Sequence, residues 1–134
     1  MGDKKYPIPY KKGSIYFQYS VKDFDRAKKF YSEVLGFEKT WDGGAEAGWA
    51  EFALPAEGAR LGLNLLREGE VKHSSGTLTL NVDDIQTTKE YLDSKGVETD
   101  DIVDIPDMVS YFNTKDTEGN GIQVVSDPRV TSEK

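Results

Sequence analysis

Apolar and polar residues alternate over residues 15–21, and this pattern predicts a half-buried strand. The apolar face of that strand would carry Ile15, Phe17, Tyr19 and Val21. Asp23 follows at the position of a helix N-cap, and apolar residues then recur at helical spacing as far as Leu35. Gly36 stands where a helix often ends. The chain therefore begins with a strand followed by a helix.

The same pattern returns 61 residues further on, so that Val82 matches Val21 and Asp84 matches Asp23. Residues 77–82 alternate, and Gly96 ends the second predicted helix. The segments that favour strands after the two helices are 37–41, 48–54 and 60–66 in the first half, and 97–103, 108–114 and 122–125 in the second. Residues 116–121 are turn-forming. Each half therefore predicts one strand, one helix and three further strands.

A half of this size cannot bury a sheet face alone, so the two halves should share one domain of the α+β class. We expect a first module over 14–66, a linker over 67–76 and a second module over 77–128. Residues 1–13 and 129–134 are predicted to be tails.

Composition narrows the chemistry that this domain can perform. The 134 residues include no Cys and a single His, which removes disulfides, thiolate nucleophiles, zinc–cysteine sites and any site that needs two imidazoles from one chain. No apolar run approaches the roughly 18–20 residues of a membrane span, and no signal peptide is visible, so we expect a cytoplasmic protein.

Charge is distributed unevenly along the chain. Residues 1–72 carry 12 Lys and Arg against 11 Asp and Glu, whereas residues 73–134 carry 5 against 13, for a net charge of −7. An acidic surface repels phosphate backbones, so a nucleic-acid partner is not expected. Two interpretations of the acidic half stay open: a solvated surface, or a field that steers a cationic ligand.

Several motifs resemble those of the vicinal oxygen chelate superfamily, which comprises glyoxalases, bleomycin-resistance proteins and dioxygenases. They are Val21-Lys22-Asp23-Phe24, residues 30–37 (FYSEVLGF), residues 48–52 (GWAEF), Val82-Asp83-Asp84-Ile85 and residues 116–120 (DTEGN). The resemblance implies two βαβββ modules whose sheets curl around a shared cavity. It also suggests a homodimer, and leaves open whether the cavity forms within one chain or between two.

Metal-dependent members of that superfamily hold a divalent ion through His, Glu or Gln at four positions. The resemblance places these positions at Tyr16, Asn64, Thr77 and Gln123. Divalent ions prefer carboxylates or neutral imidazoles, which none of the four supplies. We interpret His73, four residues before Thr77, as a linker histidine. The sequence therefore predicts neither a metal nor another cofactor.

The polar faces of the predicted strands would instead line the cavity. The candidate ligand-binding residues are Tyr16, Gln18, Trp49, Glu51, Asn64, Thr77, Thr79 and Gln123. Neutral hydrogen-bonding groups beside aromatic walls suit the orientation of a small organic molecule; the alternative is an exposed polar sheet face without a ligand. Glu51 is a candidate general base if it is partly buried, or else a strand carboxylate that is solvated or paired with a nearby Lys or Arg.

Two functions remain open at this stage. The first is a metal-free protein that binds a small aromatic or cationic molecule, as bleomycin-resistance members do. The second is a glyoxalase-like lyase or isomerase, or a dioxygenase, with an atypical metal site. Enzymatic activity is thus undecided by the sequence, although the missing ligands disfavour it.

Overall fold

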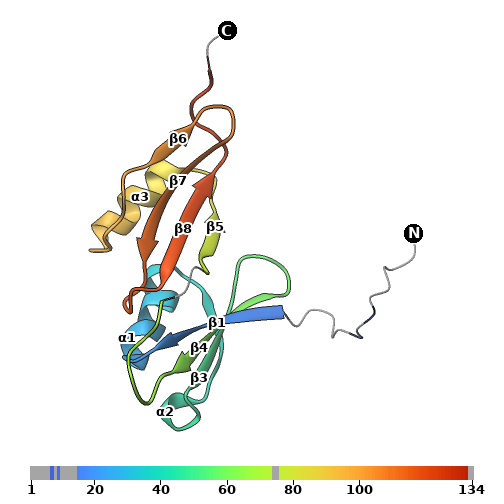
Figure 1. Ribbon diagram of the computed structural model, residues 1–134, viewed down its shortest axis with the longest axis vertical. Coiled ribbons are helices and arrows are strands. Elements are labelled where there is room, and N and C mark those ends of the chain that lie inside the picture. The colour runs from blue at the N-terminus through green and yellow to red at the C-terminus, as the bar shows by residue number, and fades with distance from the viewer. Residues whose placement is uncertain (1–6, 8, 10–14, 74–75, 133–134) are drawn as a thin grey trace.

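The computed structural model of the chain contains two four-stranded sheets, each with a helix on one of its faces (Figure 1). It describes residues 7, 9, 15–73 and 76–132. The predicted N-terminal tail, residues 1–13, lies outside the described residues apart from Pro7 and Pro9.

The first module has the strand order β1-β4-β3-β2, with β1 and β4 parallel and the other pairs antiparallel. Its elements are β1 (Ile15–Val21), α1 (Phe24–Lys29), the π-helical turn η1 (Phe30–Val34), β2 (Glu38–Asp42), α2 (Gly44–Ala47), β3 (Trp49–Ala53) and β4 (Ala59–Leu65). Alternation buries one face of β3, where Ala50 and Phe52 are fully buried.

The second module repeats this topology in the order β5-β8-β7-β6. Its elements are β5 (Leu78–Asn81), α3 (Ile85–Ser94), β6 (Val103–Ile105), β7 (Val109–Lys115) and β8 (Gly121–Ser126). The predicted pair of βαβββ modules is therefore confirmed. The strand predicted over 97–103 is wrong in position: Thr99 forms a single bridge with Thr114, and regular pairing begins only at Val103.

Both helices begin and end at the residues that the sequence indicates. The side chain of Asp23 accepts a hydrogen bond of 3.2 Å from the backbone N–H of Arg26, and that of Asp84 accepts one of 3.0 Å from Thr87. Gly36 and Gly96 have φ angles of 78° and 77°, the left-handed conformation that ends helices.

A buried hydrogen bond joins the two modules. Tyr31, in η1, is fully buried, and its hydroxyl donates a 2.8 Å hydrogen bond to Asp116 at the end of β7. The Asp116 carboxylate also accepts from the backbone N–H groups of Glu118 and Asn120, each at 2.8 Å. The turn over residues 116–121 is therefore organised around the Asp116 carboxylate, which also accepts the hydrogen bond from Tyr31 of the first module.

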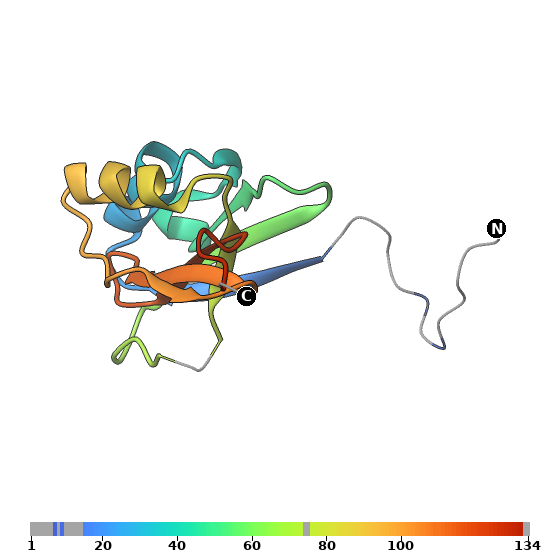
Figure 2. The same cartoon turned by 90° about the horizontal axis from the view of Figure 1, so that it is seen from above.

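Helices and sheets form two layers. Figure 2 shows α1 and α3 on the same side of the molecule, with the strands of both sheets on the other side. Each sheet thus has one face packed on the helices and an open face turned away from them. Tyr16 and Gln18 on β1, and Thr79 and Asn81 on β5, are exposed on the open faces. Among the described helices, none has the length and apolar character needed to cross a membrane.

Candidate functional site

The open face of the first sheet brings five predicted site residues onto three neighbouring strands. The register places Tyr16 of β1 beside Arg60 of β4, and Gln18 beside Gly62. On the other side of β4, Asn64 lies beside Trp49 of β3, and Gly62 beside Glu51. Because residues opposite one another share a face, Gln18, Gly62 and Glu51 form one row across the sheet.

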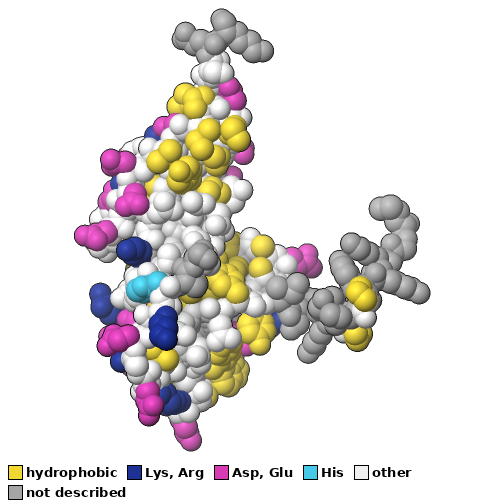
Figure 3. Space-filling view, in the orientation of Figure 1, with side chains coloured by type: hydrophobic (Ala, Val, Ile, Leu, Met, Phe, Trp, Pro, Cys, Tyr) yellow, Lys and Arg dark blue, Asp and Glu magenta, His cyan; other side chains and the backbone are white. Residues whose placement is uncertain are grey.

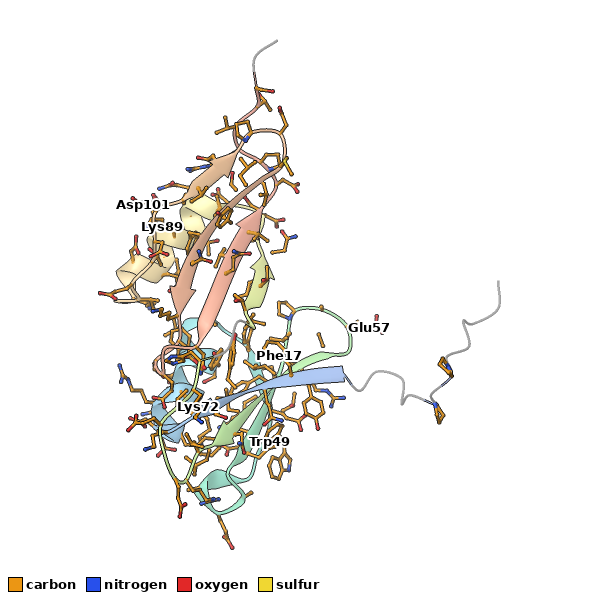
Figure 4. All side chains as sticks on the ribbon, in the orientation of Figure 1. Phe17, Trp49, Glu57, Lys72, Lys89 and Asp101 are labelled. Carbon is orange, nitrogen blue, oxygen red and sulfur yellow. The ribbon has the colours of Figure 1, made fainter. Side chains whose placement is uncertain are left out.

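Gly62 leaves room for an aromatic ring to lie across β4. A Cβ atom at Gly62 would stand 2.3 Å from Cη2 of Trp49, so the indole occupies the space that a side chain would otherwise fill. The ring reaches Tyr16 on the far side of β4, with ring centroids 5.9 Å apart in an edge-on arrangement. Figure 4 shows Trp49 on the side of the first sheet away from α1.

Glu51 is held beside this pair of rings. The indole N–H of Trp49 donates a 2.9 Å hydrogen bond to Oε2 of Glu51, and Nη1 of Arg60 lies 3.8 Å from Oε1. The side chain of Glu51 is 22% exposed. Of the two roles considered for Glu51, these contacts match a carboxylate paired with a cation more closely than a free general base. We call Tyr16, Trp49, Glu51 and Arg60 the aromatic–carboxylate cluster.

Trp41 is a further aromatic residue on this face. It lies opposite Glu51 in the pairing of β2 with β3, and it is 50% exposed. Its ring contacts Gly43, where a Cβ atom would be only 2.3 Å from Cη2. Trp41 therefore borders the aromatic–carboxylate cluster from the edge strand.

The second sheet brings Thr79 and Gln123 together. They are register partners on β5 and β8, and the Gln123 amide donates a 3.2 Å hydrogen bond to Oδ1 of Asn113 on β7. Thr77 lies just before β5 and is exposed. Asn113 was missed at the sequence level, although alternation within the strand predicted over 108–114 could have placed it on this face.

Of the four positions that the resemblance assigns to metal ligands, the two in the first module, Tyr16 and Asn64, do not lie side by side. Asn64 lies opposite Ser20, four residues along the strand from Tyr16, which is a separation of about 13 Å. The β4 residues nearest Tyr16 on the open face are Arg60, a cation, and Gly62, which has no side chain.

Chemistry and geometry thus agree that this donor set does not fit a divalent ion. Within the described part of the chain, no group of three or more His, Asp and Glu residues could hold a metal either.

The sequence from residue 14 to residue 124 matches the model of a protein family described as the Glyoxalase/Bleomycin resistance protein/Dioxygenase superfamily. This match covers most of the chain. No curated protein matches the sequence significantly.

Several solved structures share this fold, and the matched region covers nearly the whole length of each of them. TnmS3, an antibiotic binding protein from Streptomyces sp. CB03234, is 24% identical with a TM-score of 0.72, covering 92% of this chain and 99% of its own. A glyoxalase/bleomycin resistance protein from the same organism is 25% identical with a TM-score of 0.65, covering 83% and 97%. Lactoylglutathione lyase from Agrobacterium tumefaciens is 16% identical with a TM-score of 0.68, covering 84% and 91%. Such likenesses establish the fold, and the chemistry has to be argued from the site.

Proposed function

Because the chain belongs to the Glyoxalase/Bleomycin resistance protein/Dioxygenase superfamily, we propose that it binds a small, positively charged aromatic molecule, without a metal, on the open face of its first sheet. The observation that carries this proposal is the placement of the Trp49 indole over Gly62, in contact with Tyr16 and Glu51. Aromatic faces attract cations, and a neighbouring carboxylate strengthens that attraction.

The cluster is arranged before any ligand arrives. The hydrogen bond from Trp49 to Glu51 fixes both side chains, so little rotational freedom would be lost on binding. A carboxylate has about four lone-pair sites, and Trp49 with Arg60 leaves some of them for a ligand ammonium group. The net charge of −7 favours the approach of a cation.

The fold is compatible with binding, since one of the structural relatives is an antibiotic binding protein. Binding a ligand would need only the fold and the aromatic–carboxylate cluster, since no bond in the ligand has to be broken. We therefore propose sequestration of the ligand rather than its chemical conversion.

We further propose that two chains associate through their open faces. The open face of the second sheet is apolar at its outer end, where Val103 is 44%, Ile105 38% and Met108 72% exposed. Figure 3 shows hydrophobic side chains gathered over this end of the molecule. A second copy would cover this surface and give the ligand a second wall.

Association is tested by molar mass in solution. The wild type is expected to be a dimer, and Met108→Glu to shift the mass towards the monomer, with Met108→Leu as the matched control. A monomeric wild type at millimolar concentration would overturn the association.

Ligand binding is tested with Trp fluorescence and a panel of aromatic amines, each paired with its uncharged N-acetyl derivative. At least one amine is expected to change the emission and to bind at least tenfold more tightly than its N-acetyl partner. Trp49→Phe should weaken this binding, whereas Trp41→Phe keeps the cluster and serves as the control. Equal binding of both members of every pair, or no binding by any amine, would contradict the proposal.

A further inference from the structure

A cavity lies between the two modules, on the helix side of the molecule. Its volume is about 630 Å³, which is within the range of sites for small metabolites. The walls come from α1 and η1 of the first module, and from the end of α3 and the β7–β8 turn of the second. None of the residues of the aromatic–carboxylate cluster lines it.

Charges of both signs line this cavity without pairing with one another. Two of the charged lining residues have partners: Lys95 lies over the ring of Tyr91, and Asp116 accepts the hydrogen bond from Tyr31. The other cations are Arg26, Lys29 and Lys115, and the other anions are Glu33, Glu98 and Asp100. Within residues 15–73 and 76–132, none of these six side chains forms an ion pair or a hydrogen bond.

A residue that lines the cavity, Thr117, has a buried hydroxyl without a hydrogen-bond partner among the described residues. Oγ1 of Thr117, in the β7–β8 turn, is the one buried side-chain oxygen or nitrogen among the described residues that makes no hydrogen bond. Such a group loses its water on folding and gains nothing in return, unless a ligand or a water molecule satisfies it. Phe30, Val34 and Val97 supply an apolar wall in the same cavity.

We propose that this cavity binds a small zwitterion, namely an α-amino acid with an apolar side chain or a compound with the same groups. The carboxylate of the ligand pairs with the lysines and the arginine, and its ammonium group pairs with the glutamates and the aspartate. Its apolar side chain packs against Phe30, Val34 and Val97. Thr117 contributes the remaining hydrogen bond.

Three compounds with the same skeleton test this proposal by NMR. L-phenylalanine carries both charges, 3-phenylpropanoate lacks the ammonium group, and 2-phenylethylamine lacks the carboxylate. L-phenylalanine is expected to shift the backbone signals of Val97 and Thr117, and each of the other two to bind there at least tenfold more weakly. Equal shifts with all three compounds, or none with L-phenylalanine, would overturn the proposal.

The same spectra separate this site from the one proposed on the first sheet. Binding at the aromatic–carboxylate cluster shifts the indole N–H signal of Trp49, whereas binding in the cavity between the modules leaves that signal unchanged. A shift confined to Trp49 would therefore contradict the zwitterion site and leave the proposed function standing.

Substitutions at Thr117 and at the cations complete the test. Thr117→Val keeps the shape of the side chain and is expected to weaken L-phenylalanine binding by roughly 2- to 10-fold, while Thr117→Ser retains it. The double variant Arg26→Gln with Lys115→Gln should weaken binding by more than tenfold. Lys72→Gln, outside the cavity, is the control for loss of charge. Wild-type affinity in the double variant would refute the role of these cations.

Discussion

The hydroxyl of Tyr19 accepts a 2.9 Å hydrogen bond from the backbone N–H of Leu78 and donates one of 2.5 Å to the carbonyl oxygen of Gly121. Leu78 begins β5 and Gly121 begins β8, so a side chain from the first module bridges the first pair of strands in the second. Tyr19 belongs to the apolar face of β1 and is 7% exposed. The ring of Tyr19 packs in the core, and its hydroxyl links the two modules through these two hydrogen bonds.

Replacing Tyr19 by Phe should therefore destabilise the protein. Tyr19→Phe leaves the N–H of Leu78 and the carbonyl of Gly121 without this partner, and the expected loss in the free energy of unfolding is about 1–3 kcal/mol. Urea denaturation measures it. Tyr111→Phe is the matched control, because the Tyr111 hydroxyl has no hydrogen bond among the described residues. Equal stabilities of the two variants would contradict the bridging role.

The buried hydroxyl of Tyr31 predicts an alkaline loss of stability. Burial, together with the nearby Asp116 carboxylate, raises the pKa of Tyr31 far above its usual value. Above about pH 10 the tyrosine ionises in the unfolded chain but stays protonated in the folded one, so stability falls as the pH rises.

Tyr31→Phe should accordingly be less stable than the wild type at pH 7, and the difference should narrow above about pH 10. Denaturation curves at pH 7 and pH 10.5 measure both effects, with Tyr111→Phe again as the control. A difference that stays constant over this range would show that the pKa of Tyr31 is unperturbed.

Arg129, in the predicted C-terminal tail, holds Asp104 of β6. Its guanidinium donates hydrogen bonds of 2.8 and 3.0 Å to the two oxygens of Asp104, and Ser110 donates another of 2.6 Å. These hydrogen bonds lower the pKa of Asp104 to about 2, and those from Arg129 have the largest effect. Their contribution to stability is present above the normal carboxyl pKa and is lost as the pH falls towards 2.

Arg129→Gln should raise the pKa of Asp104 towards the ordinary carboxyl value. Carbon-13 NMR titration of the side chain measures the midpoint. Lys115→Gln removes the same charge without contacting Asp104, and should leave the midpoint near 2. An unmoved midpoint in Arg129→Gln would remove Arg129 as the cause.

Gly62 should be required for ligand binding because of the space it leaves. Gly62→Ala places a Cβ atom 2.3 Å from the Trp49 ring, so the indole has to move off β4 and lose its contact with Tyr16. We expect at least a tenfold loss of aromatic-amine affinity and a red-shifted Trp emission. Gly121→Ala is the control, since its Cβ would come no closer than 3.8 Å to Thr77. Unchanged affinity in Gly62→Ala would place the ligand elsewhere.

The missing donors around Tyr16 predict that ligand binding is independent of metal. Dialysis against EDTA should leave aromatic-amine affinity unchanged, and elemental analysis of the purified protein should find no stoichiometric Ni, Zn, Fe or Mn. Titration with Zn²⁺ before and after dialysis is the control. One tightly held metal per chain or per dimer would contradict this prediction.

Much of the fold could be predicted because its signals are local. Alternation gave β1, β3 and β4, the caps at Asp23 and Asp84 gave the helix starts, and Gly36 and Gly96 gave their ends. Each of these signals depends only on residues that are close in the sequence, so it can be recognised without knowing which elements pack together. The position of β6 was mispredicted because a short edge strand is defined by its neighbour.

The candidate site was predicted in its residue types but not in its geometry. The sequence by itself determined that polar and aromatic side chains alternate with the core residues, and that the usual metal ligands are missing. Only the tertiary structure decided that Tyr16 and Asn64 lie four residues out of register, that Trp49 covers Gly62, and that Arg60 faces Glu51. Register depends on which strands pair and how far each is shifted, and the pairing of β1 with β4 joins residues more than 40 positions apart in the sequence.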